Sequence, residues 1–466
     1  MLRRTPTILL LVALMVTTLL IATLVSIQQT AQVPAVAEPP MPDFETRVDY
    51  AQWFKSQLKF AEEDNAYEEY RQFMEDGHQP VFPASSKNMI MKLAKSARPW
   101  RASEYSEVAA WLDEIHPQLE AYVKGTEYQF YVSRANVDDA TLFEAMLPNI
   151  VPSYRLSIAM LVKAWQAHDG FDAEIFVRRL EIINGHANHL AQGITLPDHL
   201  MALTIKQIVY RSVAHAIAAD LLSESRLATL LSVFQADDSQ DFSAYLNRSL
   251  YTELAMAYEA LQDLCSTNGK LQPKISSSAV KGFGQPTAEV NPILKELGLT
   301  VDQLNLIVRD DPRVLSRQSH DFFTSIMETC ERSVPKDIET IIEARVNSLV
   351  KESVFHRILQ PRTERVFTTC IQAETRRRGT QLLLALAMHE GKHGTWPERL
   401  DALSPRPKRN IRTDPRSGRD FIYRTDGDTM MLYSVGMDGV DNGGTLLGED
   451  YRNRDGEDLV IWPVGP

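Results

Sequence analysis

The chain has 466 residues and a formal net charge of −12, because 61 acidic residues outnumber 49 lysines and arginines. Hydrophobic residues make up 44% of the sequence and charged residues 24%, which is typical of folded proteins and excludes a wholly disordered chain. The acidic balance argues against a nucleic-acid binder, and three cysteines are too few for a disulfide scaffold. The length favours two or three domains.

The N-terminus carries the pattern of a membrane anchor. Residues 1–7 include Arg3 and Arg4, and residues 8–27 are then uncharged and rich in Leu, Val, Ile and Ala. A helix of about 20 such residues spans roughly 30 Å, the thickness of the hydrocarbon core of a bilayer. Because the next basic residue is Arg47, the positive-inside rule predicts a cytoplasmic N-terminus and an extracytoplasmic bulk. We therefore expect a single-pass transmembrane helix and a location in the cell membrane.

A cleaved signal peptide is the alternative, because Ala35-Val36-Ala37 is a small-x-small cleavage pattern. The apolar run is longer than the usual core of a signal peptide, and the cleavage pattern lies well beyond its end. We therefore favour an uncleaved signal anchor. Residues 28–43 are rich in Pro and Ala and predict an extended linker.

The chain after this linker predicts mainly α-helices. Residues 44–265 read as successive amphipathic segments with short polar breaks, which favours a helical bundle or a stack of helical hairpins. Pro117 is expected to kink or split the segment 104–123. Residues 79–101 contain three prolines and are expected to be the one long irregular stretch of this helical ectodomain.

Two further regions follow the ectodomain. Residues 266–292 are rich in Gly, Ser and Pro and predict a linker, and residues 293–379 predict a second helical segment. Residues 380–466 predict a small C-terminal α+β domain with a short antiparallel sheet. The expected fold class is therefore mainly α, with an N-terminal transmembrane helix and this C-terminal domain.

One close histidine pair lies in the helical ectodomain. His186 and His189 are three residues apart and can share a helix face. No acid or cysteine nearby completes a set of metal ligands, so we interpret the pair as surface residues rather than a metal site.

A zinc-protease motif occurs near the C-terminus. His389-Glu390-Gly391-Lys392-His393 matches the pattern HExxH, in which two histidines one turn apart hold Zn²⁺. The intervening Glu390 can then act as the general base that activates the metal-bound water.

The residues around the motif favour a different interpretation. Gly391 weakens the helix inside the motif, and the Gly-x-Trp-Pro corner at 394–397 ends the helix directly after His393. No metzincin continuation follows, and no downstream helix offers a third ligand at an obvious spacing. We therefore keep zinc as the less favoured alternative.

The tail after the motif predicts three strands. Residues 421–424 lead through an Asp-Gly turn to residues 430–435, and residues 458–462 form the last apolar run. A Thr-Asp-Pro turn at 413–418 precedes the first strand.

This tail resembles the soluble domain of the major pseudopilin of type II secretion. The matching elements are a helix that ends in Gly-x-aromatic-Pro-x-x-Leu-x-x-Leu at 394–403, the Thr-Asp-Pro-x-x-Gly turn at 413–418, and Tyr-Ser-Val-Gly-x-Asp-Gly at 433–439. The predicted membrane segment is far away in the sequence, and no prepilin-peptidase site precedes it. Polymerisation into a pseudopilus is therefore not implied, and the tail looks like a reused module.

The resemblance implies a calcium site, because in that family an acidic loop of this domain binds Ca²⁺. Asp438, Glu457 and Asp458 match the family's positions best, and calcium takes carboxylate and carbonyl oxygens of this kind. The sequence departs from the pattern by an insertion at 445–455 and by Glu rather than Asp at 457. Solvated acidic turns without a metal remain the alternative.

These features give a functional expectation and two alternatives. We expect a membrane-anchored envelope protein, a binding protein rather than an enzyme, with a helical interaction domain and a calcium-stabilised tail. The first alternative is a membrane-bound zinc metallopeptidase that uses His389, Glu390 and His393. The second is an accessory of a secretion apparatus, with secretion proteins as partners, which rests on fold analogy alone. Nucleic acid is not an expected partner.

Overall fold

The structure is a computed structural model in which the described residues are 37–57, 64–74, 79–131, 150–193, 195–237, 242–264, 311–332, 344–349, 356, 363–436, 439–444 and 458–464. The expected anchor at 8–27 and the expected linker at 266–292 lie outside these residues. No helix in the described part of the chain is both long enough and apolar enough to cross a bilayer.

The described residues are mainly helical, with a small antiparallel sheet near the C-terminus, as the sequence predicts. The helices are α2 (Tyr50–Gln57), α3 (Tyr67–Met74), α4 (Lys87–Ser96), α5 (Ser106–Glu114), α6 (His116–Gly125), α7 (Ile150–Ala164), α8 (Ala173–Ala191), α9 (Leu196–Ala218), α10 (Glu224–Ala236), α11 (Phe242–Leu264), α15 (Pro312–Arg332), α18 (Thr363–His393) and the short α19 (Arg409–Arg412). A 3-10 turn, η4, spans Leu400–Ala402.

Two small sheets complete the fold of the described residues. Strand β1 (Trp100–Arg101) pairs in parallel with β2 (Gln166–Ala167). The C-terminal sheet has the antiparallel order β3 (Ile422–Thr425), β4 (Met430–Ser434) and β5 (Leu459–Trp462). These three strands confirm the three runs predicted from the tail.

Local sequence signals set several helix ends. Pro117 lies in the first turn of α6 and splits the predicted segment into α5 and α6, since proline fits the first turn but not a helix interior. Helix α9 begins with a capping box, in which the Thr195 hydroxyl accepts the Asp198 N–H at 3.1 Å. The Asp172 side chain caps the start of α8 by accepting the N–H groups of Glu174 and Ile175.

Helix α4 corrects the expectation of an irregular stretch at 79–101. Ile90 and Leu93 are buried, and Ala97 ends the helix in a left-handed conformation with φ 45°. Positions 90, 93 and 97 have helical spacing, and the prolines stand outside the helix rather than within it. The prolines therefore flank a helix rather than exclude one from this stretch.

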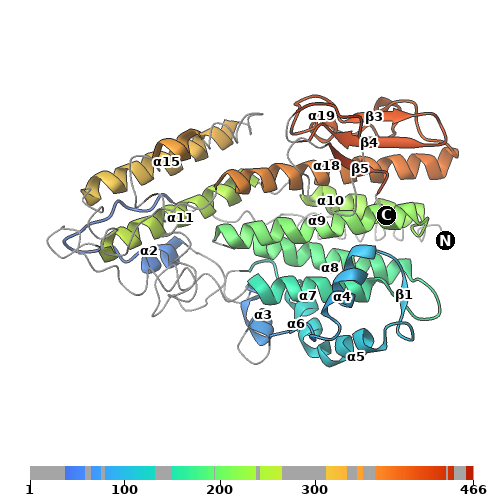
Figure 1. The fold of residues 1–466 in the computed structure, drawn as a ribbon, viewed down its shortest axis with the longest axis horizontal. Coiled ribbons are helices and arrows are strands. Elements are labelled where there is room, and N and C mark those ends of the chain that lie inside the picture. The colour runs from blue at the N-terminus through green and yellow to red at the C-terminus, as the bar shows by residue number, and fades with distance from the viewer. Residues whose placement is uncertain are drawn as a thin grey trace, which may run out of the picture.

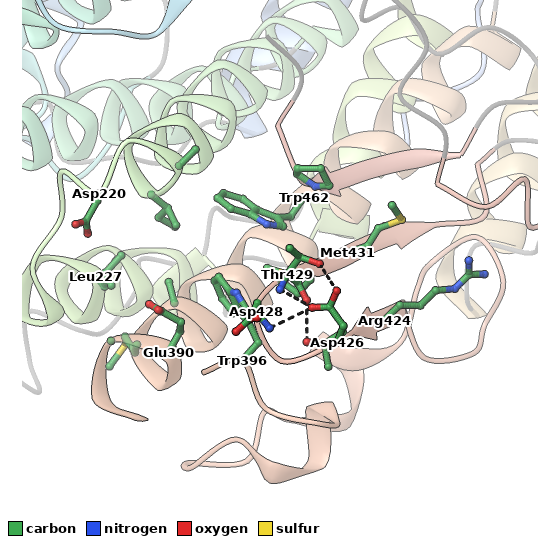
Figure 2. A pocket seen from close by; sticks show the side chains of 18 of the residues that line it. Asp220, Leu227, Glu390, Trp396, Arg424, Asp426, Asp428, Thr429, Met431 and Trp462 are labelled. Atoms are coloured by element: carbon green, nitrogen blue, oxygen red, sulfur yellow. Dashed lines mark hydrogen bonds between the residues drawn. The ribbon is translucent and has the colours of Figure 1, made fainter. Parts of the chain in front are cut away.

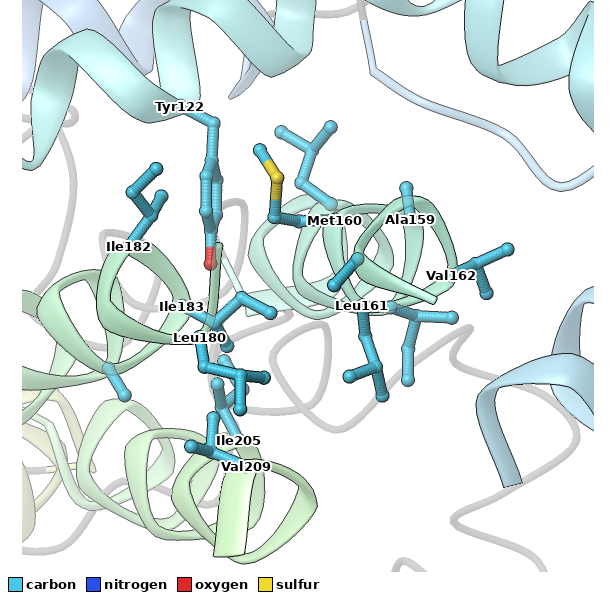
Figure 3. Close-up of a cluster of buried hydrophobic side chains, with 14 of the residues drawn as sticks. Tyr122, Ala159, Met160, Leu161, Val162, Leu180, Ile182, Ile183, Ile205 and Val209 are labelled. Atoms are coloured by element: carbon cyan, nitrogen blue, oxygen red, sulfur yellow. The ribbon is translucent and has the colours of Figure 1, made fainter. Parts of the chain in front are cut away.

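The main core lies where α7, α8 and α9 pack together (Figure 1). Figure 3 shows apolar side chains from these helices facing one another, with Tyr122 of α6 reaching in beside them. The largest hydrophobic cluster includes Leu161, Leu180, Ile205 and Val209, all fully buried. This cluster holds together helices α3 to α10, which we call the helical body.

Helix α18 joins the helical body to the C-terminal sheet. It continues without a break across residue 380, where the sequence suggested a domain boundary, and it packs on α9, α10, β4 and β5. In Figure 1 the sheet lies against the C-terminal half of α18, and α11 and α15 lie at the opposite end of the molecule. The sheet and the helical body thus share one helix.

Gly379 sets how closely β5 approaches α18. A Cβ atom at this position would lie 2.5 Å from the side chain of Ile461. We expect Gly379→Val to destabilise the protein by about 1–3 kcal/mol, because it overpacks this contact. Urea unfolding followed by circular dichroism measures the effect. Gly391→Val is the matched control, since a Cβ at that exposed helical glycine meets no atom within 4 Å; equal losses for the two variants would contradict the close contact.

Candidate functional site

Asp458 is the one residue of the expected calcium set that lies within the described chain; Asp438 and Glu457 fall outside it. Its side chain is buried directly before β5. The Oδ2 atom accepts backbone N–H groups of Asn442 at 2.9 Å and Gly444 at 2.7 Å. Asp458 therefore holds the loop that follows β4. A carboxylate is a ligand type that calcium takes, so Asp458 fits the ion chemically as well as serving this structural role.

Asp441, in the same loop, is already engaged. Its Oδ1 accepts the Tyr433 hydroxyl at 2.8 Å and the Gly443 N–H at 2.9 Å, and its Oδ2 contacts Arg424 at 2.9 Å. The hydrogen bond from Tyr433 is the main cause that lowers the pKa of Asp441. Asp441 thus secures the loop to the sheet. Within the described residues, no three His, Cys, Asp or Glu side chains gather closely enough to hold a metal.

Asp414 connects two of the motifs that carry the resemblance. It is buried within the 413–418 turn, where its Oδ1 accepts the Arg416 N–H at 2.9 Å. The same oxygen accepts the hydroxyl of Ser434, from the end of β4, at 2.8 Å. The aspartate of one motif therefore contacts the serine of the other. The sequence did not predict this contact.

The HExxH residues occupy the last turns of α18. The His389 and His393 rings have centroids 4.3 Å apart, so the spacing brings them together as predicted. Partial burial and then the neighbouring His393 and Lys392 lower the pKa of His389. Helix α18 ends at His393, directly before Gly394 with φ 72°, as the Gly-x-Trp-Pro corner predicts. No third metal-ligating side chain joins the pair among the residues described.

The pair His186 and His189 is buried, so the expectation of a surface pair is wrong. His189 accepts the Tyr70 hydroxyl at Nδ1, 2.8 Å away, and its Nε2–H donates to the Tyr128 carbonyl 3.0 Å away. Burial lowers its pKa to about 4. His189 is therefore a neutral link between α8 and the segment around α3 and α6.

His186 packs among aromatic rings. It is fully buried, with ring centroids 4.7 Å from Tyr70 and 4.3 Å from Tyr122, and its nitrogens make no hydrogen bond to a described residue. Burial holds its pKa well below the usual value. Its spacing from Ile183 and Leu190 puts it on the apolar face of α8, and that signal was present in the sequence.

A buried ion pair in the helical body was also missed. Lys206 of α9 lies 3.1 Å from Asp237, which follows α10, and both side chains are nearly inaccessible to solvent. Asn188 of α8 donates to the same carboxylate at 3.1 Å. The three groups tie three helices together, and none of them lines the cleft between the end of α18 and the C-terminal sheet.

An open cleft of about 1030 Å³ lies where the helical body meets the C-terminal sheet. Its walls come from the turn between α9 and α10, from the end of α18 and from the β3–β4 hairpin. In Figure 2, Trp396 and Trp462 lie between a wall with Asp220, Leu227 and Glu390 and a wall with Asp426 and Thr429. Glu390 of the HExxH motif is thus part of a larger concave surface.

Comparison with known proteins identifies no relative: no family model matches the sequence, and no curated protein or solved structure matches it significantly.

Proposed function

We propose that this chain is a membrane-anchored envelope protein that binds a partner through its extracytoplasmic helical body and pseudopilin-like tail. The observation that carries the proposal is the cleft between α18, the α9–α10 turn and the C-terminal sheet, because concave surfaces with aromatic walls are the usual binding sites of proteins. The contact between Asp414 and Ser434 joins two of the motifs that carry the resemblance, which supports a pseudopilin-like tail. The uncharged run at 8–27 supports the anchor.

Membrane extraction tests the anchor. We expect the full chain to remain in the membrane fraction after alkaline carbonate treatment and to be digested by protease added to the extracytoplasmic side. A variant that lacks residues 8–27 should be released by the same treatment. Release of the full chain, or its protection from external protease, would refute a signal anchor of this orientation.

Calcium binding by the tail is the second part of the proposal, and Asp458 is its most testable residue. We expect Ca²⁺ to raise the free energy of unfolding by about 2.7 kcal/mol at a concentration 100-fold above the dissociation constant. Asp458→Asn should abolish this effect. It should also weaken the loop without calcium, because a neutral amide accepts the Asn442 and Gly444 N–H groups less strongly.

Thermal unfolding in Ca²⁺ and in EGTA measures both effects, and Asp428→Asn on the exposed hairpin is the charge-matched control. The control should keep the full response to calcium. Identical unfolding of the unsubstituted protein in the two buffers would exclude calcium. A deficit of Asp458→Asn in EGTA alone would then identify Asp458 as a purely structural anchor of its loop.

A zinc metallopeptidase is the second candidate, and the 4.3 Å separation of the His389 and His393 rings favours it. Metal analysis of the purified protein discriminates between the two functions. Stoichiometric zinc that is lost in His393→Ala would favour the peptidase. Zinc below stoichiometry would leave the pair as two helix-end histidines.

A further inference from the structure

The cleft between the helical body and the C-terminal sheet is negatively charged as well as concave. The acidic residues among its described lining are Asp220, Glu224, Glu390, Asp426 and Asp428. Arg424 also lines it, but its guanidinium already contacts Asp441 at 2.9 Å. The carboxylates are therefore not balanced from within the cleft, and its field favours a cation.

The carboxylates stand on opposite walls. Asp220 is exposed in the turn between α9 and α10, Glu224 is exposed at the start of α10, and Asp428 is exposed at the tip of the β3–β4 hairpin. Asp426 holds this tip, because its Oδ1 accepts the N–H groups of Thr429 at 2.7 Å and Asp428 at 3.1 Å. The hairpin thus presents Asp428 from a fixed turn, facing the acids of the helical body.

Two tryptophans lie between these walls, as Figure 2 shows. The ring centroids of Trp396 and Trp462 are 6.2 Å apart and their planes make an angle of 49°. The backbone N–H of Trp396 donates to the backbone carbonyl of Gly427 at 3.3 Å, which ties residue 396 to the hairpin. An indole face beside carboxylates suits a guanidinium or an ammonium group, which can stack on the ring and pair with the acid.

We propose that this cleft binds a polypeptide segment of a partner protein through arginine or lysine side chains. Its volume of about 1030 Å³ is at the upper end of small-molecule pockets and its open form admits an extended chain. The excess of carboxylates supplies the charge complementarity. This inference rests on the proposed binding function, but it can fail alone, because the membrane and calcium tests do not depend on the cleft.

Fluorescence anisotropy with the full-length protein tests the proposal. The probe is a fluorescein-labelled nonapeptide in which four arginines alternate with glycines, and its control carries glutamine in place of each arginine. We expect the arginine peptide to bind and to weaken as the salt concentration rises, since exposed charges are screened. The glutamine peptide should bind at least about tenfold more weakly, because it has neither the charge nor the cation–π contact.

Variants locate the binding. Glu390→Gln combined with Asp428→Asn should weaken the arginine peptide about fivefold or more, whereas Glu107→Gln combined with Glu114→Gln on the distant α5 should not. Trp462→Leu keeps an apolar side chain but removes the π face, so we expect about two- to thirtyfold weaker binding, with Trp462→Phe in between.

Three results would overturn the proposal. They are equal binding of the two peptides, an equal effect of the cleft pair and the α5 pair, and displacement of the peptide by spermidine below the peptide's own dissociation constant. The last result would mean that a free polyamine, rather than a polypeptide, occupies the cleft.

Discussion

Asp237→Ala is expected to lower the free energy of unfolding by about 3–5 kcal/mol, because it leaves the buried ammonium of Lys206 without its carboxylate. The substitution also removes the acceptor of Asn188, 3.1 Å away. Burial makes this loss large, since water cannot solvate the remaining charge. Urea unfolding followed by circular dichroism measures it.

A second substitution separates the ion pair from general damage. Lys206→Met in the Asp237→Ala background removes the unpaired charge, so the double variant should recover much of the lost stability. Glu174→Ala breaks the surface pair with Arg226 and should cost less than about 1 kcal/mol. If the double variant lost as much stability as Asp237→Ala and Lys206→Met added together, Lys206 and Asp237 would have no coupling energy.

Acidification is expected to destabilise the protein between pH 6.5 and 4. Burial lowers the pKa of His189 and of His199 to about 4, and it holds the pKa of His186 well below its usual value. In the unfolded chain these rings take up protons near pH 6.5. Their contribution to stability is therefore complete above pH 6.5 and is lost as the pH falls toward 4.

The size of this effect follows from linkage. Each of His189 and His199 can remove at most about 3 kcal/mol over this range. Three acids act in the opposite sense, because burial raises the pKa of Glu253 to about 7, that of Asp198 to about 6 and that of Glu374, so the folded state takes up their protons first. The histidines with a lowered pKa outnumber these acids, because burial also lowers the pKa of His215 and of His356 to about 4, and the net slope should favour unfolding in acid.

Urea unfolding at pH 7 and pH 5 measures the slope. His189→Gln should make the protein less stable at pH 7, since it disturbs the bonds to Tyr70 and Tyr128, but should reduce the loss on acidification by about 1.4 kcal/mol per pH unit. An unchanged slope in His189→Gln would show that this ring is not the titrating group.

The candidate site was predictable only in its pieces. The sequence located Glu390 and Asp458, and the resemblance named the motifs around Trp396 and Ser434. It could not indicate that Glu390 faces the β3–β4 hairpin, because the two are joined only by the fold around α18. The cleft combines the α9–α10 turn with residues more than 150 positions later, and no local pattern encodes such a meeting.

Periodicity and turn chemistry by themselves determined the predominance of helices, the split at Pro117, the strands β3 to β5 and the end of α18 directly before Gly394. Each of these depends on residues within one or two turns of the chain. The tertiary structure alone decided that His186 and His189 are buried, that Lys206 meets Asp237, and that the tail packs on α18 to leave an acidic cleft. Burial and charge pairing depend on which distant segments pack together, and local sequence patterns do not specify that packing.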